Sequence, residues 1–83
     1  MNDVYKKIIE MLEMVLDKKL DENEVTRDTN IFEELKVDSL GVLELVDMIE
    51  EEWGIDINQN PELIDAMEIV GELEKYVTEW IKK

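Results

Sequence analysis

Apolar side chains recur at helical spacing in three stretches of the chain. Residues 4–16 place them at i, i+4, i+7 and i+8, which predicts an amphipathic helix. Residues 39–53 repeat the period, with Leu45, Ile49 and Trp53 four positions apart. Residues 69–82 carry a third apolar stripe, and an asparagine followed by Pro61 predicts a short helix over 61–66. The pattern therefore predicts three main helices and one short one.

The connection between the first two helices, residues 20–37, lacks this period and is polar and turn-rich. Asn30 with Glu33 three positions later is a capping pattern, which predicts a short helical turn there. We expect the apolar residues of the connection to hold it against the core; these are Leu20, Val25, Ile31, Phe32 and Leu35. The connection is thus predicted to be a long, anchored loop.

Residues at the ends of the predicted helices support these helix boundaries. Asp38 and Ser39 are both good N-cap residues for the second helix, and Gly54 suits the position after its end. Gly71 costs the last helix about 1 kcal/mol relative to alanine, which indicates close packing near its start. Trp53 and Trp80 are expected in the core. We predict an all-α fold, a small four-helix bundle with a long first loop, as a single domain over residues 1–83.

The composition of the chain excludes several classes of function. The chain has 83 residues with 23 acidic and 9 basic side chains, a net charge of −14, and neither histidine nor cysteine. Such a surface repels nucleic acid and anionic membranes, and the natural partners are basic protein patches. Without histidine or cysteine, we expect no metal site and no enzyme acting alone. No signal peptide or membrane span is expected, so we expect a cytoplasmic protein, and a monomer.

The negative charge is concentrated in the second half of the chain, where residues 39–83 carry a net −9 against −5 for residues 1–38. In the second helix Glu44, Asp47 and Glu51 follow 3–4 spacing and share one face. A solvated face is the simpler interpretation. The lack of compensating bases favours a docking surface for a basic partner, because solvated faces normally mix signs.

Asp38-Ser39-Leu40 stands where the long loop meets the second helix. Taken alone it is an ordinary helix cap. A serine hydroxyl at a helix N-terminus is nevertheless exposed, and the positive end of the helix dipole favours an attached phosphate. Without histidine or cysteine in the chain, Ser39 cannot be an activated nucleophile. It can be a site that another enzyme modifies.

The segments Leu35-Lys36-Val37-Asp38-Ser39-Leu40, Glu44-Leu45-Val46 and Glu50-Glu51-Glu52-Trp53-Gly54-Ile55-Asp56-Ile57 resemble the core of the acyl carrier proteins. Length, acidity, the long first loop and the helix order are similar as well. The resemblance implies that Ser39 receives a 4′-phosphopantetheine arm from coenzyme A through a Mg²⁺-dependent phosphopantetheinyl transferase. The thiol of the arm would then carry acyl groups as thioesters to acyl-transfer, synthase or ligase enzymes with basic docking patches.

The same resemblance implies roles for further residues, position by position. The partner-recognition surface would consist of Asp38, Leu40, Glu44, Asp47, Glu50 and Glu51. Val46, Ile57 and Met67 would lie near the acyl chain's entrance or pocket, although plain core packing explains Met67 equally well.

Two departures from the family pattern stand out: Lys36 replaces the usual glycine, and Asp47 replaces an apolar residue. They disfavour a housekeeping role in fatty-acid synthesis and favour a carrier dedicated to another pathway. A fatty acyl chain and a polyketide intermediate both remain candidate cargoes, in fatty-acid, polyketide or related biosynthesis. An aminoacyl (D-alanyl or peptidyl) carrier is the alternative within the family, although Asp38 before the serine favours acyl cargo. An acidic interaction module without a prosthetic group is the alternative from another class.

Overall fold

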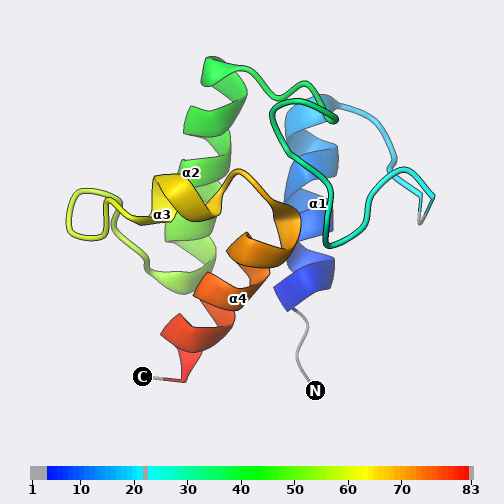
Figure 1. Ribbon diagram of the computed structural model, residues 1–83. Helices are drawn as coiled ribbons and strands as arrows, with labels where there is room; N and C mark the ends of the chain where they lie inside the picture. Colours follow the sequence, from blue (N-terminus) through cyan, green and yellow to red (C-terminus); the bar gives the residue numbers. More distant parts are fainter. Residues whose placement is uncertain (1–3, 22, 83) are drawn as a thin grey trace.

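The computed structural model describes residues 4–21 and 23–82 and contains four helices in that part of the chain. They are α1 (Val4–Leu16), α2 (Ser39–Trp53), α3 (Leu63–Ala66) and α4 (Val70–Ile81). In Figure 1, α1 and α2 run side by side in opposite directions, α4 crosses below them, and α3 is a single turn beside α2. The predicted all-α bundle with a long first loop is confirmed.

All four helices contribute to one hydrophobic core. The stripes predicted from periodicity face inward, so that Ile8 and Leu12 of α1 meet residues of α2 and α4. The largest fully buried side chains are Ile8, Leu12, Ile31, Leu45, Ile49, Ile55, Leu63, Met67, Val70, Leu73 and Val77. Trp53 and Trp80, predicted as core, are half-buried and pack at its edge, where Trp80 Nε1 donates to the Trp53 carbonyl over 3.1 Å.

The helix ends differ from the prediction by only a few residues. α1 ends without a glycine, because Asp17 adopts the left-handed conformation (φ 55°) and the Lys18 amide donates back to the Glu13 carbonyl over 3.1 Å. α3 is shorter than predicted, since Pro61 and Glu62 form a turn ahead of it. The link after α2 is irregular, and Ile57 lies in a turn.

The first loop is anchored as predicted, with Leu20, Val25 and Ile31 buried. At the predicted helical turn, the Asn30 side chain accepts hydrogen bonds from the amides of Phe32 (2.9 Å) and Glu33 (2.8 Å). The residue that returns a bond to the Asn30 amide is Glu34, over 3.0 Å, and not Glu33 as predicted. The segment forms hydrogen-bonded turns, and no helix begins there.

Backbone hydrogen bonds join this loop to the start of α4. Residues 27–31 lie against residues 68–71, and we call this contact the loop–α4 seam. The Ile31 amide donates to the Glu68 carbonyl (2.8 Å) and the Gly71 amide to the Arg27 carbonyl (2.8 Å). The Arg27 guanidinium also forms a two-pronged ion pair with Glu74, at 2.6 and 3.0 Å, and lies over the ring of Tyr5. The seam fixes the end of the loop that leads into α2.

Tyr76 adds one more link at the surface, because its hydroxyl donates to Glu62 over 2.8 Å and so joins α4 to the turn before α3. Burial and this hydrogen bond raise the pKa of Tyr76 to about 12, since both favour the neutral phenol. The phenol therefore remains a hydrogen-bond donor at neutral pH.

Candidate functional site

Ser39 is the first residue of α2 and is exposed to solvent. It is also the only serine in the chain. Asp38 precedes it in an extended conformation, and the Asp38 Oδ1 accepts a hydrogen bond from the Gly41 amide over 2.8 Å. This cap starts the helix at Ser39, so its hydroxyl stands at the positive end of the α2 dipole.

The loop residues just before Asp38 set the path of the chain as it reaches Ser39. Val37 is buried, and its amide donates to the Ile31 carbonyl over 3.2 Å. Lys36 adopts the left-handed conformation with φ 61°, the region that favours glycine. The chain therefore keeps the turn for which the resemblance expects glycine, but it makes that turn with a lysine.

A phosphate ester fits these surroundings. The Ser39 hydroxyl is exposed, the helix dipole favours negative charge at this point, and Lys36 is exposed three residues earlier. The Asp38 carboxylate is engaged as the cap, and no charged group is buried at Ser39. The residues present are compatible with a phosphodiester on Ser39 that extends into solvent.

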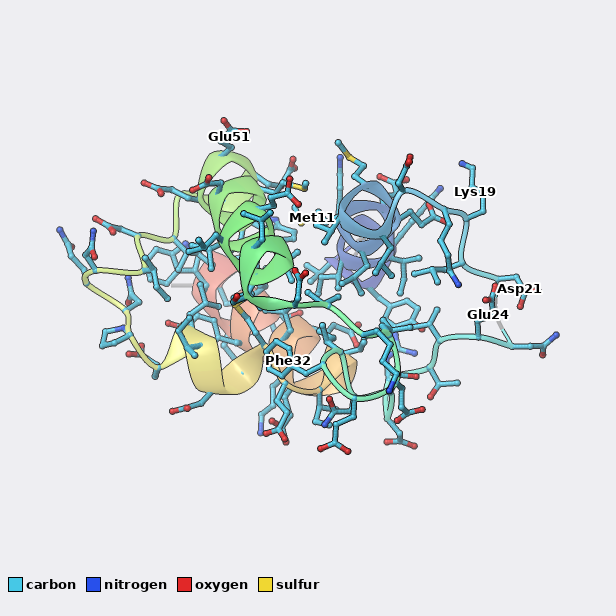
Figure 2. The ribbon with its side chains drawn as sticks, turned by 90° about the horizontal axis from the view of Figure 1, so that it is seen from above. Met11, Lys19, Asp21, Glu24, Phe32 and Glu51 are labelled. Carbon is cyan, nitrogen blue, oxygen red and sulfur yellow. The ribbon has the colours of Figure 1, made fainter. Side chains whose placement is uncertain are left out.

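The predicted docking residues share the exposed side of α2. Glu44, Asp47, Glu50 and Glu51 are all exposed, and Figure 2 shows Glu51 pointing away from the molecule. Among the described residues, the α2 carboxylate that forms an ion pair is Glu52, 3.8 Å from Lys7. The other carboxylates of this side are available to a partner, and Leu40, 67% exposed, stands beside them.

The three residues predicted near an acyl chain are largely covered by the rest of the molecule. Val46 and Met67 are buried within the core, and Ile57 is half-buried against it. Met67, which directly follows α3, has no exposed surface, so here it acts as a packing residue of the core. A cargo that entered at this point would have to displace Met67 or its neighbours.

The surface of the described residues is also hollowed in places. A groove of about 290 Å³ lies beside the start of α2, and its lining includes Val15 and Leu16 of α1. Apart from the α1 stripe, no sequence pattern indicated a role for these two residues. A larger cavity of about 600 Å³ lies between α1 and the first loop, on the side of α1 away from α2, where Figure 2 labels Lys19 and Asp21. It contains none of the predicted site residues.

In the part of the chain that the structure describes, three or more acidic side chains nowhere gather as a metal site would require. Over the same residues, no helix combines the length and apolarity that crossing a bilayer demands.

Comparison with known proteins points to the same part of the chain. A family model described as "Phosphopantetheine attachment site" matches residues 6–60, which include Ser39. The acyl carrier protein of Rickettsia massiliae (strain Mtu5) is 37% identical over 76 residues, covering 92% of this chain and 84% of its own. That of Rickettsia canadensis (strain McKiel) is 44% identical over 54 residues, covering 65% of this chain and 60% of its own.

Proposed function

This chain belongs to the acyl carrier proteins, and we propose that Ser39 is the residue to which its 4′-phosphopantetheine is attached. The observation that carries the proposal is the exposed serine at the first position of α2, behind the Asp38 cap. No other serine competes for the role, because Ser39 is the only one in the chain.

Each residue near Ser39 has a definite part in this proposal. The Ser39 oxygen forms a bond to the β-phosphorus of coenzyme A, the pyrophosphate bond breaks, and adenosine 3′,5′-bisphosphate leaves. The hydroxyl proton passes to a base of the transferase, since Asp38 is engaged as the helix cap and the chain has no histidine. The dipole of α2 stabilises the phosphodiester that results. When bound, the arm supplies the thiol that this cysteine-free chain lacks.

The protein thus holds acyl groups for other enzymes and catalyses no reaction itself. We propose that phosphopantetheinyl transferase and enzymes of acyl transfer, synthesis or ligation dock through basic patches on Asp38, Leu40, Glu44, Asp47, Glu50 and Glu51. The exposure of the α2 carboxylates supports this assignment. The proposal takes the carrier as one domain over residues 1–83, monomeric and cytoplasmic, with Val46, Ile57 and Met67 next to the cargo.

The direct test is the intact mass of the protein. We expect one added phosphopantetheine after incubation with coenzyme A, Mg²⁺ and a broad-specificity phosphopantetheinyl transferase. Ser39→Ala is expected to gain nothing, because it removes the acceptor oxygen and leaves the Asp38 cap in place.

Thr26→Ala serves as the control, since it removes a hydroxyl of the first loop that accepts the Asp28 amide and leaves α2 unchanged. It should be modified as fully as the wild type. An unmodified wild type, under conditions that convert another carrier completely, contradicts the assignment of Ser39.

A further inference from the structure

The most exposed large apolar side chains gather at one end of the molecule. Met14 in the last turn of α1 is 69% exposed, and Leu40 and Leu43 at the start of α2 are 67% and 63% exposed. These ends of α1 and α2 lie together at the top of Figure 1. Ile81, 52% exposed, ends α4 at the other end of the molecule. Exposed apolar side chains that gather in this way mark interaction sites.

A groove lies between the same two helix ends, and we call it the α1–α2 groove. Its lining comprises Val15, Leu16, Lys36, Val37, Asp38, Leu40, Gly41 and Glu44, and its volume is about 290 Å³. Gly41 brings the helices close, because a Cβ there would lie 3.0 Å from Val15 Cγ1 and 2.9 Å from Val37 Cγ1. The groove is mixed in character: valine and leucine side chains form part of its lining, and Lys36, Asp38 and Glu44 contribute charged groups.

We propose that phosphopantetheinyl transferase seats an apolar side chain in the α1–α2 groove, next to a basic group that meets Glu44. This inference rests on the proposed function of Ser39, because it concerns the enzyme that must reach that residue. The carrier would thus be recognised through the end of α1 as well as through α2.

Two observations favour the transferase as the occupant. Leu40 lines the groove and directly follows Ser39, so an enzyme that acts on Ser39 must pass this point. Glu44 belongs both to the groove and to the exposed acidic side of α2, which makes the groove continuous with that docking surface. A second copy of this chain fits less well, because each copy carries a net charge of −14 and would repel the other.

The test compares two variants that make the same chemical change at opposite ends of the molecule. Met14→Glu places a carboxylate in the last turn of α1, directly before the groove residues Val15 and Leu16, and Ile81→Glu places one at the end of α4. Because an apolar contact would be lost, Met14→Glu should raise the KM of the transferase for the carrier about fivefold or more. Ile81→Glu should change KM by less than about twofold, with kcat similar for both.

A second measurement does not depend on the Met14 variant. Ser39→Ala, labelled with ¹³C at its methyl groups, is titrated with the transferase and coenzyme A and followed by NMR. The methyl signals of Val15, Leu16 and Leu40 should shift or broaden, and that of Ile81 should not.

Equal effects of Met14→Glu and Ile81→Glu, or unperturbed Val15 and Leu16 methyl groups in the complex, would overturn the inference and leave Ser39 as the attachment site. A dimer of the wild type that Met14→Glu dissociates would also overturn it, in favour of a second copy. A wild type that is not modified at all contradicts the proposed function itself.

Discussion

Lys36 adopts a backbone conformation that is unfavourable for a residue with a Cβ. Its φ of 61° lies in the left-handed region, where a Cβ approaches the following carbonyl oxygen. A glycine would adopt this conformation without that contact. Lys36 is also the only basic residue between Arg27 and Lys75, and no ion pair of the described residues involves it. Its backbone strain has no evident compensation within the chain.

Replacement of Lys36 by glycine is therefore expected to stabilise the protein. Relief of the left-handed strain, less the added flexibility of glycine in the unfolded chain, amounts to about 0.5–1 kcal/mol. This corresponds to a rise of about 3–6 °C in the melting temperature, measured by circular dichroism. Lys36→Ala removes the same charge but keeps the Cβ. If alanine stabilises as much as glycine, the lost charge and not the strain is responsible.

Single residues show what the sequence could and could not predict. The Asp38 cap and the end of α2 at Gly54 follow from local preferences, and both predictions are confirmed. The capping pattern indicated Glu33 as the partner of the Asn30 amide, and this was wrong: the amide donates to Glu34, because the partner depends on the path of the turn. The left-handed end of α1 at Asp17 gave no signal either, since no glycine marks it.

Among the elements, the loop–α4 seam accounts for a glycine whose role the sequence could only outline. Gly71 costs α4 helix propensity, and this indicated close packing near the start of the helix. The structure confirms it: a Cβ at Gly71 would lie 2.8 Å from the carbonyl oxygen of Arg27. The same oxygen accepts the hydrogen bond of the Gly71 amide over 2.8 Å. A side chain at residue 71 would therefore force the loop away from α4.

Gly71→Ala is expected to lower the free energy of unfolding by about 1–2 kcal/mol, since overpacking costs about 1–3 kcal/mol and alanine returns up to about 1 kcal/mol of helix propensity. Urea denaturation measures the change. Lys75→Ala, at an exposed position of the same helix, should remain within about 0.5 kcal/mol of the wild type. A Gly71→Ala protein as stable as the wild type would mean that the loop–α4 seam can shift without lowering the free energy of unfolding.

The three main helices could be predicted because each has its own apolar period, visible over a dozen residues, and the short α3 because proline after asparagine marks a helix start. The seam could not, because it joins Arg27, Thr29 and Ile31 to residues about forty positions later through backbone atoms. Side-chain patterns do not record such pairing. The α1–α2 groove escaped prediction for a related reason: Val15 and Leu16 belong to the α1 stripe, and only the packing angle of the helices leaves them partly open.

Over the whole molecule, the uneven charge gives the protein a preferred direction of approach. The exposed acidic side of α2 adjoins Ser39, and the basic residues are mostly in the first 36 positions. A partner with a basic patch is therefore drawn toward α2 before contact. Since each exposed pair contributes only about 0–1 kcal/mol, the effect requires several carboxylates together.

Reversal of two of these charges, Glu44→Lys with Glu51→Lys, is expected to reduce the transferase kcat/KM severalfold, mainly through slower association. The wild-type rate should fall as salt rises, because the Debye length shortens to about 8 Å at physiological ionic strength. Glu10→Lys with Glu79→Lys is the control, since both residues are exposed on α1 and α4. Glu13, on the same helix as Glu10, is not used in the control, because its carboxylate accepts a hydrogen bond from the Leu20 amide.

Equal losses from the two double reversals, in proteins that remain folded by circular dichroism, would mean that net charge alone governs the encounter. A loss confined to the α2 pair would agree with docking on that side.

The contact between Trp53 and Trp80 gives the protein a built-in fluorescent reporter. Both indoles of the chain lie at the contact between the end of α2 and α4, where one donates to the backbone of the other residue. Ser39 begins the same helix, about 20 Å away along its axis. Intrinsic emission therefore follows the opening of the bundle and is insulated from chemistry at the serine, so that the stability of the unloaded and the loaded protein can be compared without a label.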